Sequence, residues 1–332
     1  MNSEFKDKII LITGGTGSIG SNLTEMILKH EPRQLRILSR NEGNQYEFLE
    51  RLKHPKNLRI LIGDIRDRDR IEYAFKNVDI VIHAAAMKQV PLCEYNPFEA
   101  IKTNIIGSQN IIDAAINNEV KKVLAVSTDK SVHPTSIMGV SKLMMEKIFT
   151  NANWSSPKGH TRFACVRFGN VAWSHGSVLP IWDKQAKEKG IISVTNPDMT
   201  RFIMSVNQAS FFILRSIELM QLGEIFVPKM PSIRIGDLAR LFLKKHYTAK
   251  DISINVEGSR IGDKIHEELV DDSDRAGYIL ENKDMYIFIP RSLELYNHQY
   301  NAPDYPGCKK ISSIGNYSSN EHIDLEKIEQ II

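Results

Sequence analysis

Cysteine is scarce in this sequence, and its few copies show no pattern of a bridge or a metal site. The 332 residues include three cysteines, Cys93, Cys165 and Cys308, an odd number at wide spacings. A disulfide framework needs an even set, and a structural metal site needs closely spaced ligand pairs. The sequence therefore predicts buried or unreactive thiols and no metal site.

Long apolar runs are also missing. No run approaches the roughly 18 residues that suggest a membrane span. The N-terminal stretch carries charges up to Lys8 and then a short apolar run that ends in glycines. A signal peptide needs a longer apolar region and a cleavage site of small residues. We therefore expect a β-strand here, no membrane segment and a cytoplasmic protein.

Neither positive nor negative charge dominates the chain. Its 43 basic and 40 acidic residues give a net charge of +3, and they are interspersed rather than clustered. A nucleic-acid-binding protein shows a basic patch or stripe instead. We expect no nucleic-acid partner, whereas a mild local excess of Lys and Arg suits an anionic small molecule.

The first half of the chain alternates between short apolar runs and helical stretches. Helical spacing of apolar residues is seen at 18–30, 46–52 and 97–118. The apolar runs are "KIILIT", "LRILS", "LRILIGD", "VDIVIHAAA" and "KKVLAVS". Short buried strands that alternate with helices predict an α/β fold, a Rossmann-type doubly wound parallel sheet covered on both faces.

The alternation of apolar runs and helical stretches becomes less regular after about Asn170, where Gly-, Pro- and Asn-bearing segments follow one another. We expect residues 1–170 to form the Rossmann domain, with some later segments returning to it. Residues 171–332 should form mainly a smaller C-terminal lobe that binds substrate, and the tail should end in a short helix.

The segment "TGGTGSIG" follows the first predicted strand and opens a helix. Its glycines permit a tight turn and the close approach of a pyrophosphate, whose charge the helix N-terminus stabilises. This context predicts a dinucleotide site, and the alternative is a glycine-rich turn without a ligand. The residues expected around the cofactor are Gly14, Thr16, Gly17, Ser18, Ile19, Gly20, Ser39, Arg40, Asp64, Ile65, Ala84, Ala85, Ala86 and Lys142.

The end of the second predicted strand bears on the choice of cofactor. An acidic residue there would bind the ribose hydroxyls of NAD, but the chain has Ser39, Arg40 and Asn41. A guanidinium matches the geometry of a 2′-phosphate, so NADP is favoured and NAD stays possible. Arg40 could instead stack on the adenine. Asp64 would lie near the adenine or cap the next helix.

The segment "STDKSVHPTSIMGVSK" lies where an open α/β sheet binds ligands, beyond the carboxyl end of a strand. Thr128 ends the strand, and Met138 and Lys142 share one face of the helix that follows. The neighbours Asp129 and Lys130 form an acid/base pair if both point to a ligand. Their spacing alone is equally consistent with a surface salt bridge in a turn.

Several segments together resemble the extended short-chain dehydrogenase/reductase superfamily, and within it the UDP-N-acetylglucosamine 4,6-dehydratases of polysaccharide biosynthesis. The resemblance covers residues 13 to about 269. The segments that carry it are "TGGTGSIG", "HAAAMKQVPLCEYNPFEAIKTNIIGSQN", "STDKSVHPTSIMGVSK", "VRFGNV", "SHGSVLP", "MTRF", "GEIFVPKMPS" and "GSRIGDKIHEEL". The longer blocks are far more specific than the glycine motif.

The resemblance implies an internal redox cycle on UDP-N-acetylglucosamine or a close UDP-sugar, with NADP. Sugar C4 is oxidised, water is eliminated across C5 and C6, and the hydride returns to C6, which gives a 4-keto-6-deoxy sugar. In the family's pattern Asp129 protonates the leaving C6 hydroxyl, Lys130 removes the C5 proton and Thr128 binds the C4 oxygen. Reprotonation at C5 with retained or inverted configuration stays open.

Met138 departs from the tyrosine that the superfamily usually has four residues before Lys142. A thioether cannot accept a proton from an alcohol, so another group must take the C4 hydroxyl proton. Lys130, Lys142 and a water held by Thr128 are the candidates. Lys142, directly or through a water, is preferred, and Met138 is then a residue of the helix core.

The resemblance also assigns residues to the substrate. For each, a surface or structural role is the alternative, and Glu267 is expected to cap or to hold Arg260. The expected substrate-binding set is Lys88, Asn104, Asn170, Arg201, Arg260 and Glu267.

Two other functions are weighed against the dehydratase. A UDP-sugar 4-epimerase needs no base at C5, which leaves Lys130 idle. A non-catalytic NADP-binding sensor should have lost its acid/base pair and its arginines, yet both are present. The family also implies a homo-oligomer, with the helices around 97–117 and 136–150 as the interface.

Overall fold

The protein, described here from a computed structural model, is built around one large β-sheet. The structure describes residues 2–156, 160–247, 251–270, 274, 277–290 and 304–332. The strand order in the sheet is β15-β13-β14-β10-β6-β5-β4-β1-β2-β3. The strands from β3 across to β10 run parallel to one another. The expected Rossmann-type parallel sheet is confirmed.

The elements of the N-terminal half follow the predicted alternation. The strands are β1 (Ile9–Thr13), β2 (Gln34–Ser39), β3 (Leu58–Ile62), β4 (Ile80–His83), β5 (Lys122–Val126) and β6 (Arg162–Val166). The helices are α1 (Asn2–Phe5), α2 (Ser18–Leu28), α3 (Glu42–Arg51), α4 (Arg68–Phe75), α5 (Val90–Tyr95), α6 (Pro97–Ile101), α7 (Gly107–Asn117) and α8 (Ile137–Asn151). Short helical turns are η1 (Lys102–Ile106), η2 (Asp129–Ser131) and η3 (Ala152–Trp154).

The C-terminal half is richer in regular structure than its composition indicated. Its strands are β7 (Asn170–Val171), β8 (Ile191–Val194), β9 (Thr200–Met204), β10 (Ile225–Pro228), β11 (Ser232–Arg234), β12 (Ser253–Val256), β13 (Tyr278–Glu281), β14 (Met285–Ile289) and β15 (Lys309–Ile311). Its helices are α9 (Val178–Lys189), α10 (Val206–Leu219), α11 (Ile235–His246) and α14 (Leu325–Ile331).

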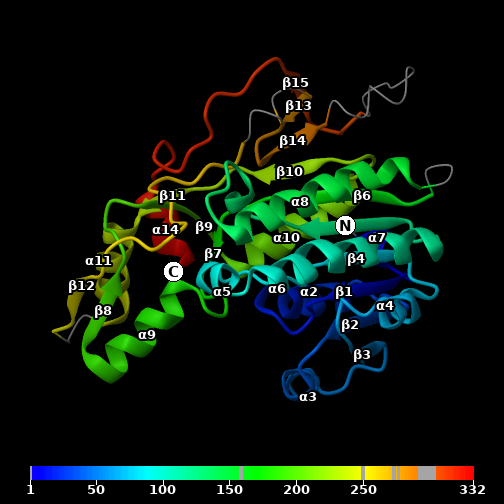
Figure 1. The fold of residues 1–332 in the computed structure, drawn as a ribbon, viewed down its shortest axis with the longest axis horizontal. Coiled ribbons are helices and arrows are strands. Elements are labelled where there is room, and N and C mark those ends of the chain that lie inside the picture. Colours follow the sequence, from blue (N-terminus) through cyan, green and yellow to red (C-terminus); the bar gives the residue numbers. More distant parts are fainter. Residues whose placement is uncertain (1, 157–159, 248–250, 271–273, 275–276, 291–303) are drawn as a thin grey trace.

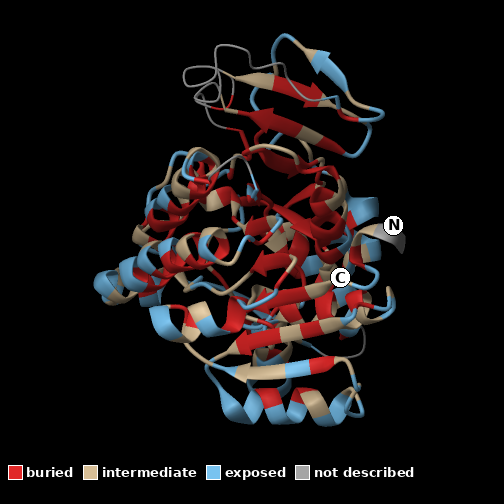
Figure 2. Cartoon of the chain, turned by 90° about the vertical axis from the view of Figure 1, so that its right-hand side faces the viewer, coloured by how far each residue is buried: buried red, intermediate tan, exposed pale blue. Residues whose placement is uncertain are grey.

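Helices cover both faces of the sheet. On one face α2 packs against α10, and on the other α7 packs against α4 and α8 (Figure 1). The central strands are buried and the outer helix faces are exposed (Figure 2), because apolar strands of a parallel sheet need cover on both sides. The strand order reverses between β1 and β4, which is where such sheets bind ligands.

The second half of the chain contributes both to this sheet and to a separate lobe. Strand β10 adds a seventh parallel strand, and β14, β13 and β15 extend the sheet antiparallel. The lobe holds α9, α11, α14 and the pair β8–β12 beside the sheet (Figure 1). Its own core includes Trp182, Ile192, Phe242 and Ile328.

The stretch 97–118, predicted as one helix, is divided by a π-helical turn. The α6 helix ends at Ile101, η1 follows as that turn, and α7 begins at Gly107. Such turns inside helices often mark functional sites. Here the turn carries Asn104, which is buried next to the candidate site.

Two sequence-based expectations can be compared directly with the described part of the chain. None of its helices combines the length and the apolar character that crossing a membrane requires. Within those same residues, no cluster of His, Cys, Asp or Glu side chains is arranged to hold a metal ion.

Candidate active site

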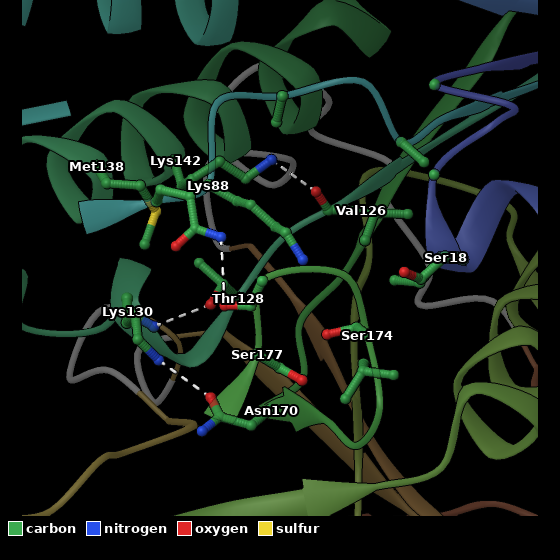
Figure 3. A pocket seen from close by; sticks show the side chains of 18 of the residues that line it. Ser18, Lys88, Val126, Thr128, Lys130, Met138, Lys142, Asn170, Ser174 and Ser177 are labelled. Carbon is green, nitrogen blue, oxygen red and sulfur yellow. Dashed lines mark hydrogen bonds between the residues drawn. The ribbon is translucent and has the colours of Figure 1, made fainter. Parts of the chain in front are cut away.

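A cavity of about 660 Å³ lies between the carboxyl ends of the parallel strands and the C-terminal lobe. Its walls come from both halves of the chain: Lys88, Lys130 and Lys142 face the same space as Asn170 and Ser177 (Figure 3). A site assembled between a Rossmann sheet and a lobe suits a ligand with two chemically different ends.

The glycine-rich turn forms one end of this cavity. Gly14 has a φ of +73°, and a Cβ there would lie 2.8 Å from the backbone nitrogen of Ala85. Only glycine fits such a turn. The N-terminus of α2 follows at Ser18. The predicted cofactor residues that line the cavity are Gly14, Thr16, Gly17, Ser18, Ile19, Gly20, Ser39, Arg40, Asp64, Ile65, Ala84, Ala85, Ala86 and Lys142.

The end of β2 places the exposed side chain of Arg40 at the cavity. The Arg40 side chain is 61% exposed, and its Nη1 lies 3.7 Å from Oδ2 of Asp64. Asp64 is already held by Arg66, whose Nη2 donates to Oδ2 at 2.7 Å. Asp67, not Asp64, caps α4. Arg40 therefore lines the cavity with its guanidinium only loosely engaged.

The turn after β5 places the acid/base pair at the cavity wall. Lys130 Nζ donates to Oδ1 of Asp129 at 2.9 Å and to Oδ1 of Asn170 at 3.3 Å. Thr128 Oγ1 also donates to Oδ1 of Asp129, at 2.9 Å. Thr128 and Lys130 line the cavity, whereas Asp129 is fully buried behind them. The pair is thus no surface salt bridge.

Burial governs the charge of this pair. It raises the pKa of Asp129, and nearby Glu267 raises it further against the opposing effect of Lys130. Burial alone would lower the pKa of Lys130, but Asp129 and Glu267 outweigh it and hold the pKa above its usual value. Oδ2 of Asp129 is buried without a hydrogen-bond partner. A carboxyl group in this setting is well suited to carry a proton.

The helix α8 positions Met138 and Lys142 beside the pair. Ser136 caps the helix by accepting from the backbone nitrogen of Gly139. A Cβ on Gly139 would lie 2.3 Å from the carbonyl oxygen of Lys130, so glycine lets the helix approach the turn at Asp129–Ser131. Met138 is buried in a small cluster with Cys93 and also lines the cavity.

Lys142 reaches the cavity from the next turn of α8. Its Nζ donates to the carbonyl oxygen of Val126 at 2.6 Å and to Sδ of Met145 at 2.9 Å. Desolvation lowers the pKa of Lys142 to about 8. A lysine with this pKa exists in both forms near neutral pH, as a proton acceptor requires.

The predicted substrate residues fall into two groups. Lys88, Asn170 and Arg260 line the cavity, and desolvation lowers the pKa of Lys88. Asn104 does not line it: its side chain is buried and bonds to both backbone groups of Met87.

Arg201 and Glu267 also lie outside the cavity lining. Both are buried, with Nε of Arg201 3.7 Å from Oε1 of Glu267. The expectation that Glu267 holds Arg260 is wrong, because Glu267 pairs with Lys130, Arg201 and Lys264. Within a short loop, Arg260 instead lies 3.9 Å from Glu257.

A buried ionic network behind the turn was not predicted. Arg167, the residue directly after β6, bonds to Glu146 of α8 at 2.6 Å and to Asp274 at 2.5 Å. Ser131 bonds to Glu146 at 2.8 Å and to the carbonyl oxygen of Thr128 at 2.7 Å. The network therefore ties η2 to the sheet. An arginine inside the apolar run "FACVRF" was the signal available in the sequence.

Most residues on the lobe side of the cavity were also not predicted individually. It is largely apolar, with a few small polar side chains, as in pockets that enclose a planar or sugar group. Only the segment "SHGSVLP" gave a hint, without roles for its residues. The lining residues without a sequence-based role include Ser174, Ser177, Val178, Leu179, Ile203, Ile235, Leu238, Ile261 and Asp263.

Comparison with known families identifies the chain. Residues 10–288 match the family described as polysaccharide biosynthesis protein. The chain belongs to this family. The resemblance inferred from the sequence motifs is thereby confirmed.

Relatives of similar identity carry different names. An uncharacterized membrane protein of Methanocaldococcus jannaschii is 43% identical over 99% of this chain and 96% of its own length. A UDP-N-acetylglucosamine 4,6-dehydratase (inverting) of Campylobacter jejuni is 41% identical over 96% of this chain and 94% of its own length. A UDP-glucose 4-epimerase of Rickettsia akari is 38% identical over 99% and 96% respectively.

A solved structure supports the fold over nearly the whole chain. Pen from Bacillus thuringiensis superimposes with a TM-score of 0.91 at 40% identity, covering 99% of this chain and 98% of that one. The fold described above is thus one that a relative also adopts.

Proposed function

We propose that the protein is a UDP-N-acetylglucosamine 4,6-dehydratase that uses a tightly held NADP. Membership of the family makes it an enzyme of nucleotide-sugar modification, and the names of the relatives divide between dehydratase and epimerase. The observation that carries the choice is the buried Asp129–Lys130 pair at the cavity wall. An elimination across C5 and C6 needs a base for the C5 proton and an acid for the leaving C6 oxygen, whereas a 4-epimerisation moves a proton only at the C4 oxygen and needs neither of these two groups.

The cofactor end of the cavity fits a dinucleotide. The turn at Gly14 accepts no side chain, and the N-terminus of α2 offers backbone N–H groups to a pyrophosphate. Ser39 and the exposed Arg40 suit a 2′-phosphate. A nicotinamide bound there would supply the hydride chemistry, oxidation at C4 and reduction at C6.

The elimination then uses groups of the chain itself. Lys130 Nζ takes the C5 proton, which the C4 ketone makes acidic. The electron pair forms the C5–C6 double bond, and the C6–O bond breaks. The leaving oxygen receives a proton from Asp129 and departs as water. Because Asp129 is fully buried, its proton passes through a side chain that lines the cavity, and Thr128 Oγ1 and Lys130 Nζ both lie 2.9 Å from its Oδ1.

The C4 hydroxyl proton goes to Lys142, directly or through a water. Met138 occupies the position of the usual tyrosine and is buried against Cys93, so it offers no acceptor. Lys142 lines the cavity, and its pKa of about 8 permits the neutral amine near neutral pH. A 4-epimerase remains the second candidate because relatives bear that name.

Product analysis in deuterated water tests the proposal. The protein is incubated with UDP-N-acetylglucosamine and the sugar is followed by NMR. The expected product is a 4-keto-6-deoxy sugar with deuterium at C5, and its couplings report retention or inversion there. Formation of the C4 epimer without deuterium would establish an epimerase instead, and unchanged sugar would contradict both enzymes.

A further inference from the structure

Glu267 joins the C-terminal lobe to the catalytic turn. Its side chain is 3% exposed, and its Oε1 lies 3.4 Å from Nζ of Lys130. Its backbone is fixed, because its N–H donates to Oγ of Ser319 at 2.9 Å and its carbonyl accepts from the N–H of Ser319 at 2.8 Å. A carboxylate held this firmly in the interior keeps its position during turnover.

The amine of Lys130 is surrounded by acceptors. Oδ1 of Asp129 lies at 2.9 Å, Oδ1 of Asn170 at 3.3 Å and Oε1 of Glu267 at 3.4 Å. An ammonium group has three hydrogens; here it donates to Asp129 and Asn170, and the carboxylate of Glu267 forms an ion pair with it. To act as a base, Lys130 must first give up one of these protons, and Asp129 is the nearest acceptor.

The charges around the amine decide when this happens. Asp129, Glu267 and, more distantly, Arg201 face Lys130. Around Glu267, burial would raise its pKa, but the cations Lys130, Arg201 and Lys264 keep the pKa below its usual value. Glu267 is therefore a carboxylate, and its negative charge acts on the Asp129–Lys130 pair.

We propose that Glu267 is a positioning residue of the elimination, which aims the Lys130 amine and sets the pH range in which the Asp129–Lys130 pair works. The proposal rests on the dehydratase function proposed above. When the Lys130 proton moves to Asp129, the neutral amine keeps two hydrogens, and Glu267 and Asn170 accept them. The nitrogen then carries one lone pair, the electron pair with which it takes the C5 proton.

The test is the pH dependence of C5 proton exchange in Glu267→Gln. Glutamine keeps an acceptor at this position but removes the charge. Since an anion beside a titrating pair raises both of its apparent pKa values, the whole pH–rate profile should move to lower pH by about one to three units. The matched control is Glu268→Gln, because Glu268 pairs with His133 instead, at 2.5 Å. Its profile should coincide with that of the wild type.

A second variant gives a shift of opposite sign. Lys264 Nζ lies 3.6 Å from Oε2 of Glu267, and Lys264→Gln removes a cation that offsets the carboxylate. Its profile should move to higher pH, which tests the proposal even where Glu267→Gln does not fold. A lower rate with an unshifted profile in either variant would reduce Glu267 to a structural residue.

The outcome is separable from the proposed function. The wild type must first exchange the C5 proton, and failure there contradicts the dehydratase rather than the role of Glu267. Oxidation at C4, followed by the absorbance of reduced nicotinamide, should proceed in Glu267→Gln with its pH dependence unchanged. A shift of that step as well would contradict a role confined to the elimination.

Discussion

Oγ1 of Thr128 donates a hydrogen bond to Oδ1 of Asp129 at 2.9 Å, and of the two residues only Thr128 lines the cavity. The hydroxyl therefore stands between a buried carboxyl group and the substrate. In the proposed elimination, Thr128 would be part of the route by which the proton of Asp129 reaches the leaving oxygen.

Replacing the hydroxyl of Thr128 should slow the elimination. Thr128→Val keeps the shape of the side chain and removes the hydroxyl group that would carry the proton. The rate of product formation should fall by about 10²- to 10⁴-fold, which is the rate enhancement that a general acid typically contributes. Thr128→Ser keeps the hydroxyl and should retain most of the activity. Equal rates in the two variants would remove Thr128 from the proton route.

Oxidation at C4 should depend on the protonation of Lys142. Because desolvation lowers the pKa of Lys142 to about 8, the neutral amine accumulates as pH rises through that value. The single-turnover rate of C4 oxidation should rise over the same range and then level off. Lys142→Arg stays charged at all these pH values and should give a low, flat profile. A wild-type rate that does not change with pH near 8 would mean that another group accepts the C4 hydroxyl proton.

Arg40 should set the preference for the phosphorylated cofactor. Arg40→Ala removes the cation nearest the end of β2 and should weaken NADP binding by roughly 10- to 100-fold, with little effect on NAD. Arg51→Ala is the control, since Arg51 on α3 pairs with Glu25 at 2.9 Å. Calorimetric titration with both cofactors measures the difference. Tighter binding of NAD than of NADP by the wild type would contradict the assignment.

Arg167 should be essential to stability. Its removal leaves the buried carboxylates of Glu146 and Asp274 without their cation. Arg167→Met should therefore lower the free energy of unfolding by about 3–5 kcal/mol, measured by urea denaturation. The exposed pair Arg51–Glu25 provides a control, and Arg51→Met should cost less than about 1 kcal/mol. Similar losses of unfolding free energy in both variants would show that the buried network stabilises the fold no more than an exposed ion pair does.

An apolar surface on α5, α6 and α8 should hold two copies of the chain together. Tyr95 is 88% exposed and Phe98 72% exposed, and these helices pack side by side. Exposed aromatic clusters of this kind mark interaction sites. Phe98→Glu should yield monomers in light scattering, whereas Tyr46→Ser on α3 should leave the oligomer intact. A monomeric wild type would refute the interface.

The sequence predicted the parallel part of the fold well because its signals are local. Each strand from β1 to β6 is a short apolar run, and the motif at Gly14 follows directly from the turn it forms. The lobe was harder to predict. Strand β8 pairs with β12 about sixty residues later, and short, half-exposed strands carry little periodicity of their own.

The residues of the candidate site also divide into those that local sequence signals predicted and those that they did not. Residues next to strand ends, such as Thr128 and Lys130, were expected at the carboxyl edge of the sheet because parallel strands end there, and both line the cavity. The partners of Glu267 were not, since they lie far away in the sequence. Burial and ion pairing across the fold are tertiary properties, which one sequence does not specify by spacing.

The fate of the C4 hydrogen tests the dehydratase assignment most directly. UDP-N-acetylglucosamine carrying deuterium at C4 is converted by the protein, and the position of the label in the product is read by NMR. We expect deuterium in the C6 methyl group, because in the proposed cycle the hydride taken from C4 returns to C6 after water has left across the Asp129–Lys130 pair. Deuterium retained at C4 of an epimerised sugar would contradict the account and identify an epimerase.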